Sequence, residues 1–341
     1  MTSSRITFGY LCDFRNPPPW HRPWAQLYAE MLDFIVHAEA LGFAGIWLPE
    51  HHLSDDGYLP SPMTMLAAIA ARTTRVKIGT AVALAPLYHP VRFAEDCAVI
   101  DILSNGRLEM AIGVGYRKRE TDAFSVPFRT RGSRTDEFIQ IVRRLWAGET
   151  VTHETEHFLV KGASIMPLPL TGHIPLFIGG FSQRALQRAA EYGDGYHGKI
   201  EGFDSYVEKL RALGKDPASA RIREHHLNFF VAHDPEKAWE ELGPYLLYGS
   251  MAYSKWLNEE TMNYDVDNLD LIIQPMTLEE FKASGRVEIL TPSQAIAYVE
   301  DMLARAPVEH FMMFVPPGVP LARFREYAEL FASEVMPAFQ K

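Results

Sequence analysis

The sequence predicts an α/β protein folded as a (β/α)8 TIM barrel, and three observations support this fold class. Eight short apolar runs alternate with segments of helical periodicity along the 341 residues. Repeated strand-then-helix units imply a parallel sheet, because parallel neighbours need a crossover helix between them. Eight such units close naturally into a barrel. The competing fold is a doubly wound open sheet, which the same alternation allows.

The first two units show the pattern most plainly. An apolar run at 6–11 ends in a proline-rich loop and predicts a strand. In the helix predicted over 24–41, apolar residues recur every three or four positions, and Gly42 follows as a C-terminal glycine. The second unit is a strand at 44–48 and a helix over 62–72 that begins with proline.

The third and fourth units follow the same order. The third strand is predicted at 76–84, and its helix begins after Pro90 and ends near the turn sequence Ser104-Asn105-Gly106. The fourth strand is predicted at 108–112. A longer segment separates it from the next helix, predicted over 136–147.

Four further strands complete the predicted barrel. They are predicted at 175–178, 195–200, 226–232 and 310–315. Helical patterns follow the fifth, sixth and eighth strands, over 182–192, 206–213 and 320–339.

Two connections are long enough to be insertions, at 114–173 after strand four and at 245–290 after strand seven. Loops that follow barrel strands emerge at the face where active sites and specificity elements lie. The sequence has no internal repeat, low-complexity tract or linker. We therefore expect a single barrel domain over residues 1–341.

Composition excludes several classes of partner. The formal net charge is -10, and no basic cluster resembles a nucleic-acid footprint. No apolar stretch reaches the ~18 residues of a membrane span, and the N-terminus does not resemble a signal peptide. We expect a cytoplasmic protein with Cys12 and Cys97 reduced, although a bridge between them stays open.

The second strand ends in Glu50-His51-His52, and such adjacent titratable groups suit proton transfer near neutral pH. The alternative is a structural histidine at the barrel rim. Metal hydrolysis with His51, His52 and His89 is a further alternative. It is disfavoured because neighbouring residues of a strand point to opposite faces. We therefore expect no metal.

Three other strand ends lack charge and carry small residues. Small side chains from Thr80 to Ala83 would let a flat ligand approach, and Gly113 allows a sharp turn. Gly179-Gly180-Phe181-Ser182 opens a helix whose N-terminal N–H groups favour an anion such as a phosphate. A plain capped turn is the alternative there. Neither a Rossmann fingerprint nor a P-loop is present.

Several segments resemble the bacterial-luciferase-like family of flavin-dependent monooxygenases and deazaflavin-dependent dehydrogenases. The matching text is GFAGIWLPEHH (42–52), VKIGTAVALAPLYHPVRFAEDCAVIDILSNGRLEMAIGVG (76–115), IPLFIGGFSQRALQRAAEYGDG (174–195) and ASEVMPAF (332–339). The resemblance implies a (β/α)8 barrel that binds reduced FMN, or a deazaflavin coenzyme, at the carboxyl ends of its strands.

The resemblance also assigns roles to residues. It implies that His51 is catalytic, steered by Glu50 or His52, and that a cis peptide bond joins Ala81 and Val82 beneath the flavin ring. The cofactor-binding residues it implies are Thr80, Ala81, Val82, Gly113, Gly180, Phe181, Ser182 and Gln183.

One position departs from the family pattern. Val114 stands where luciferase places an arginine that binds the flavin phosphate. Arg117, Arg119 and Arg184 are the candidates to replace it.

The function so implied is oxygenation of a small organic substrate by reduced FMN and molecular oxygen, with the FMN supplied by a separate flavin reductase. The family also implies a homodimer formed through the helices beside strands two and three. The alternatives are a deazaflavin-dependent dehydrogenase or reductase, and a flavin-binding protein without catalytic activity.

Overall fold

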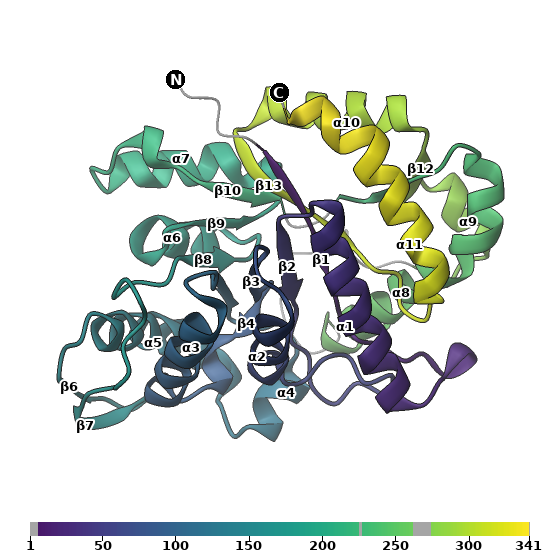
Figure 1. Ribbon diagram of the computed structural model, residues 1–341. Helices are drawn as coiled ribbons and strands as arrows, with labels where there is room; N and C mark the ends of the chain where they lie inside the picture. Colours follow the sequence, from purple (N-terminus) through teal and green to yellow (C-terminus); the bar gives the residue numbers. More distant parts are fainter. Residues whose placement is uncertain (1–5, 225–226, 262–273, 341) are drawn as a thin grey trace.

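The computed structural model describes residues 6–224, 227–261 and 274–340 (Figure 1). The strands of its main sheet are β1 (Thr7–Leu11), β2 (Gly45–Leu48), β3 (Lys77–Thr80), β4 (Ala83–Leu84), β5 (Met110–Gly113), β8 (Leu176–Gly179), β9 (Gly195–Gly198), β10 (Ile222–Glu224) and β13 (Val308–Phe314). The α-helices are α1 (Trp24–Leu41), α2 (Pro62–Arg72), α3 (Pro90–Ser104), α4 (Lys118–Ala123), α5 (Arg131–Trp146), α6 (Gln183–Tyr192), α7 (Phe203–Ala212), α8 (Pro235–Thr261), α9 (Leu278–Ala283), α10 (Pro292–Arg305) and α11 (Leu321–Leu330).

The nine strands form one parallel sheet in the order β3-β2-β1-β13-β10-β9-β8-β5-β4. The two strands at the ends of this order, β3 and β4, are consecutive pieces of a single strand interrupted at residues 81–82. A bridge between Ile78 and Leu108 also joins β3 to the segment before β5. The ring therefore has eight strand positions and is nearly closed, and the prediction of a (β/α)8 barrel is confirmed.

Helices surround the barrel, as Figure 1 shows, and the main apolar core lies between them and the strands. Strand residues with outward side chains, such as Phe8 and Tyr10, pack on helical residues such as Phe331 and Phe34. Inside the barrel a second, smaller cluster contains Leu11, Trp47, Ala81 and Met312. This arrangement follows from the period of two along a strand, which sends alternate side chains inward and outward.

The amino end of the barrel interior is filled by a buried polar network. Arg223 lies over the Phe177 ring, with its guanidinium carbon 3.5 Å from the ring centroid, and it pairs with Glu109. The indole nitrogen of Trp47 donates to Nε2 of His310 over 2.7 Å. Burial, reinforced by the charge of Arg223, holds the pKa of His310 well below its ordinary value. Room for a ligand must therefore be sought at the carboxyl end.

Strand seven of the barrel was wrongly predicted. The apolar run at 226–232 is not the barrel strand; residues 229–231 form β11 (Phe229–Val231), which pairs with β12 (Glu288–Leu290) in a separate two-stranded sheet. The barrel strand is β10, which is buried although it carries Arg223 and Glu224. Its Arg223 pairs with Glu109, which is far away in the sequence. Because two of its three residues are charged, the strand shows no apolar run from which it could be predicted. Residue His226 lies outside the described residues.

The two insertions follow β5 and β10, and the second begins earlier than the predicted 245–290, because α8 starts at Pro235. The first contains α4, α5 and an antiparallel hairpin of β6 (Val151–Glu154) and β7 (Leu159–Ala163). Its helix α5 begins at Arg131, earlier than predicted. The second contains α8, with Pro244 inside the helix, and α9. Both cysteines are buried and free. Within the described ranges, no helix is long and apolar enough to cross a membrane.

Candidate active site

His51 lies just beyond the carboxyl end of β2, and its side chain is buried. Four aromatic rings surround its imidazole. They belong to Tyr58, Tyr116, Tyr253 and Trp256, with ring centroids 4.8, 5.5, 6.2 and 5.2 Å from that of His51. These rings come from the loops after β2 and β5 and from α8. The imidazole therefore lies inside the rim of the barrel, where a group that transfers a proton to a bound ligand would have to lie.

The partner of His51 is Glu120, which sequence reasoning missed. Nδ1 of His51 lies 2.9 Å from Oε1 of Glu120, whose side chain is 1% exposed. The expectation that Glu50 or His52 steers His51 is wrong. Glu50 instead binds Nε2 of His52 at 2.9 Å and accepts from the backbone N–H of Leu84. The sequence feature that could have pointed to Glu120 is its place in the connection after strand four, which emerges at the predicted active-site face.

The small-residue segment after β3 contains the cis peptide bond expected between Ala81 and Val82. Thr80 is fully buried, and its hydroxyl donates to the carbonyl oxygen of Ala111 over 2.6 Å. Its side chain therefore ties the β3 strand to β5. Ala81 belongs to the interior cluster with Leu11 and Trp47.

The side chain of Val82 explains why two positions at the rim, 113 and 179, are occupied by glycine. A Cβ atom added to Gly113 would stand 2.7 Å from Cγ2 of Val82, and one added to Gly179 would stand 2.4 Å from its Cγ1. Real side-chain carbons do not approach so closely. The structure thus gives Gly113 a packing reason, and its contact with a cofactor stays a prediction.

The segment from Gly180 to Gln183 leads from β8 into α6, with Ser182 as the N-cap and Gln183 as the first helical residue. Gly180 has φ +134, and a Cβ there would stand 2.8 Å from Cβ of Ala185, so a side chain would not fit. Ser182 caps the helix by accepting from the N–H of Ala185 over 3.2 Å. Because its oxygen serves as acceptor, its hydroxyl hydrogen can still donate to an anion. Gln183 accepts from Ser205, and Phe181 is 37% exposed.

A cation beside this turn was also missed by sequence reasoning. Nζ of Lys199, in the loop after β9, lies 5.9 Å from the centroid of the Phe181 ring. Of the arginines considered in place of Val114, Arg117 is buried, and its Nη1 pairs with Glu120 over 3.0 Å. Arg119, Arg184 and Lys199 are exposed, and Arg184 lies in α6 itself. Lys199, whose ammonium lies near the Phe181 ring, and Arg184 are therefore the candidate cations for a phosphate at α6.

The histidine and the turn lie on one rim but not in contact. His51 follows β2 and Gly180 follows β8, three strand positions away. With about 4.8 Å between neighbouring strands, these positions are about 15 Å apart along the barrel wall. Val82 lies between them. An extended ligand, with a flat head near His51 and an anionic tail at α6, would be needed to reach both.

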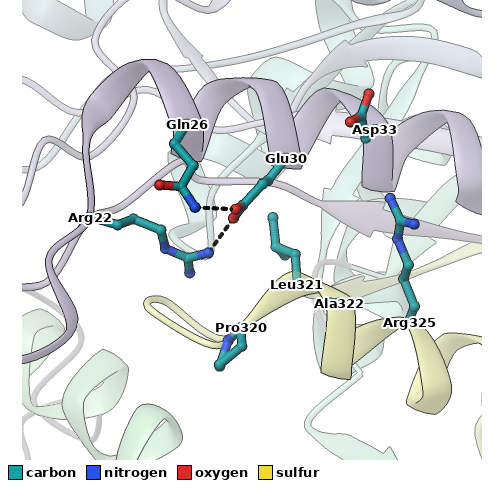
Figure 2. Close-up of a pocket in the computed structure, with 8 residues that line it drawn as sticks. All are labelled: Arg22, Gln26, Glu30, Asp33, Pro320, Leu321, Ala322 and Arg325. Atoms are coloured by element: carbon teal, nitrogen blue, oxygen red, sulfur yellow. Dashed lines mark hydrogen bonds and ion pairs between the residues drawn. The ribbon is translucent and has the colours of Figure 1, made fainter.

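The larger of the two described pockets lies elsewhere. Its volume is about 350 Å³, and it lies outside the barrel between α1 and the start of α11 (Figure 2). Its lining residues are Arg22, Gln26, Glu30, Asp33, Pro320, Leu321, Ala322 and Arg325. Figure 2 shows Arg22 and Gln26 bound to Glu30, and Asp33 pairs with Arg72. Since Arg22, Glu30 and Asp33 already bind other side chains of the protein, we place the candidate site at the rim and not here.

These features define a (β/α)8-barrel protein whose candidate site is a set of polar and small residues at the carboxyl ends of its strands. The chain belongs to the luciferase-like monooxygenase family, whose family model matches residues 6–292. The predicted resemblance is thereby confirmed.

Relatives within this family use two kinds of cofactor. The chain is 25% identical to the oxygenase component of the flavin-dependent trigonelline monooxygenase of Acinetobacter baylyi, over 93% of this chain and 91% of that protein. It is 28% identical to an F420-dependent glucose-6-phosphate dehydrogenase of Mycolicibacterium gilvum, over 92% and 94%. The crystal structure of monooxygenase RslO1 from Streptomyces bottropensis shares the fold, with a TM-score of 0.79, 24% identity and coverage of 98% and 100%.

Proposed function

We propose that this chain is a monooxygenase that binds reduced FMN at the rim of the barrel and uses molecular oxygen to oxidise a small organic substrate. The observation that carries the proposal is the placement of a buried imidazole–carboxylate pair and a glycine-opened helix start on one rim. A flavin phosphate would occupy one position, and its ring would reach towards the other. When bound, the reduced flavin supplies the electrons for oxygen activation.

Three groups are proposed to hold the cofactor. Val82 and its neighbours Thr80, Ala81 and Gly113 would lie against the ring. The segment that opens α6, from Gly180 to Gln183, would bind the phosphate through backbone N–H groups and the Ser182 hydroxyl. Lys199 would supply the positive charge that Val114 lacks. These residues fit a flavin phosphate because the turn is uncharged, glycine-rich and next to a cation.

His51 is proposed to donate or accept a proton during the reaction. It is a titratable group at the rim, and the aromatic rings around it exclude water. The rings of Tyr253 and Trp256 come from the insertion after β10, which is where substrate specificity is expected to reside.

A flavin reductase is the proposed source of reduced FMN, since the trigonelline relative is named as an oxygenase component. A homodimer is proposed because α3, one of the helices expected at the interface, exposes apolar side chains. The second candidate function is a deazaflavin-dependent dehydrogenase. The F420-dependent relative favours it, because it matches nearly the whole chain.

The test is a binding titration of the purified protein with oxidised FMN, with reduced FMN under anaerobic conditions and with F420. We expect reduced FMN to bind most tightly and to raise Tm with concentration. Tighter binding of F420 would replace the proposal by the second candidate, and no binding of either would refute both.

A substitution of Lys199 tests where the FMN phosphate binds. Lys199→Ala should weaken FMN binding about tenfold, since a hydrogen bond to a charged group contributes about 1.5–3 kcal/mol. Lys161→Ala, an exposed lysine on β7, is the matched control and should leave the affinity unchanged. Equal affinities of the two variants would remove Lys199 from the site.

A further inference from the structure

We propose that Glu120 is the positioning residue for His51, fixing which ring nitrogen carries the proton and leaving Nε2 for proton transfer. The inference rests on the proposed role of His51 and deepens it. Glu120 and His51 are 69 residues apart in the sequence, and α4 brings the carboxylate back over the end of β2.

The geometry around Glu120 determines the direction of the hydrogen bond. Its Oε1 lies 2.9 Å from the backbone nitrogen of His52 and 3.0 Å from Nη1 of Arg117. Both of these groups can only donate, so Oε1 is an acceptor. The third contact of the same oxygen, at 2.9 Å, is Nδ1 of His51. Nδ1 therefore carries the hydrogen, and in the neutral imidazole Nε2 holds the free lone pair.

The charge of Glu120 supports the same assignment. Burial raises the pKa of this carboxyl, but the hydrogen bonds from His51 and His52 and the charge of Arg117 outweigh it, and the pKa is lowered overall. The side chain of Arg117 is only 2% exposed. A buried carboxylate that is fixed by a buried guanidinium cannot rotate freely, so it holds the imidazole in one orientation.

The neighbouring carboxylate cannot take this role. Oε1 of Glu50 accepts from the hydroxyl of Tyr88 and contacts Nε2 of His52, and its Oε2 accepts from the N–H of Leu84. Each histidine of the pair is thus held by a carboxylate of its own. The Glu120 pair is the one in contact with Tyr58 and Trp256, whereas His52 packs on Phe124.

The positioning unit is also in contact with the helix that covers the site. The guanidinium carbon of Arg117 lies 4.5 Å from the ring centroid of Trp256, on α8. The same indole lies 5.2 Å from the imidazole of His51. Trp256 therefore packs on both ends of the Arg117–Glu120–His51 chain and shields its hydrogen bonds from water.

The experiment observes His51 directly in protein without any flavin. Long-range ¹H–¹⁵N NMR of protein labelled at histidine reports which ring nitrogen is protonated, and His51→Gln assigns the signal. In the native protein, with His51 in its neutral form, we expect Nδ1 protonated and Nε2 unprotonated. Glu120→Leu keeps most of the volume but removes the acceptor oxygen, whereas a glutamine would still offer one, and it should yield a mixture of both tautomers.

Controls separate positioning from general damage. Glu137→Leu is matched, because Glu137 binds Nε2 of His153 at the same 2.9 Å but between α5 and the β6 hairpin strand. It should leave the His51 signal unchanged. If Glu120→Leu does not fold, the double variant Glu120→Leu with Arg117→Met also removes the unpaired cation and repeats the test. An unchanged Nδ1-protonated state in a folded Glu120 variant would overturn the inference.

Flavin binding then distinguishes the two proposals. We expect Glu120→Leu to bind reduced FMN within about threefold of the native affinity and to lose at least about tenfold in flavin-dependent oxygen consumption. If the native protein binds no flavin, the proposed function fails while the tautomer result still decides the role of Glu120. Full oxygen consumption with a mixed tautomer would refute the positioning role alone.

Discussion

At the scale of single residues, two carboxylates near Arg15 have pKa values shifted in opposite directions. Burial raises the pKa of Asp13 to about 6, more than the charge of Arg15 lowers it. Asp56 is also buried, but Nε and Nη2 of Arg15 lie 2.7 and 2.6 Å from its Oδ2. The charge and hydrogen bonds of Arg15, with those of Ser54 and Tyr248, outweigh burial and lower the pKa of Asp56.

The two carboxylates should therefore affect stability with opposite dependence on pH. Asp13 has a folded pKa of about 6, above its unfolded value of about 4. The folded state binds more protons in this interval, so its stability falls as pH rises from about 4 to 6. Asp13→Asn should be more stable than the native protein by about 2 kcal/mol at pH 7.5 and gain little at pH 4, as measured by urea unfolding.

Asp56→Asn is the companion measurement. The stability that Asp56 contributes is present above its unfolded pKa and is lost as pH falls through the lower folded pKa. This variant should destabilise the protein more at pH 7.5 than at acidic pH. If the two variants shifted stability in the same direction at pH 7.5, the assignment of the ion pair to Asp56 would be wrong.

At the scale of elements, α8 covers the site through side chains spaced along the helix. The hydroxyl of Tyr248 donates to Asp56 over 3.0 Å, and that of Tyr253 bonds to the hydroxyl of Tyr58. Trp256 packs over Arg117 further along. The helix is thereby fixed to the loops after β1, β2 and β5, so its position decides how closed the rim is.

Removing the hydrogen bond between Tyr248 and Asp56 should increase local opening of α8 without affecting the barrel strands. Tyr248→Phe removes one hydrogen bond to a buried carboxylate and should reduce stability by about 1–2 kcal/mol. Hydrogen exchange should accelerate within α8 and stay unchanged in β1 and β2. Tyr245→Phe is the control, because the Tyr245 ring packs against Trp20 with ring centroids 4.4 Å apart and that contact is preserved. Uniform acceleration over the whole barrel would show that α8 does not open separately.

At the scale of the whole molecule, the outer face of α3 exposes apolar side chains. Val99, Ile102 and Leu103 are 46%, 38% and 52% exposed, and Leu170, whose N–H donates to Asp101 of this helix, is 53% exposed. Such a cluster on one face marks a surface that association would bury. It lies on one of the two helices at which the family resemblance places the dimer interface.

We therefore expect light scattering with size-exclusion chromatography to show a dimer. Leu103→Glu would bury a charge in the interface and should convert the dimer to a monomer that keeps its fold. Leu213→Glu changes an exposed leucine after α7 in the same way and should have no effect on mass. A monomeric native protein, or dissociation by both variants, would contradict a dimer interface on α3.

Much of the fold could be predicted because the apolar period and the flanking prolines and glycines are properties of neighbouring residues. Helices α1, α2 and α3 begin and end where the apolar period and the flanking proline or glycine indicated. The local structure at Gly180 and Ser182, a glycine with positive φ followed by a helix cap, could be predicted because consecutive residues form it. Their contact with a cofactor stays a prediction. Strand β10 was missed since a three-residue strand with Arg223 and Glu224 has no apolar period of its own.

The sequence by itself determined the barrel, the rim that would carry the site and the histidine on it, because strand alternation and short motifs are properties of neighbouring residues. Only the tertiary structure decided which groups meet across that rim. Glu120 and Trp256 reach His51 from segments far along the chain, and Val82 imposes glycine at 113 and 179. Closing the ring brings these residues together, and no local pattern encodes that proximity.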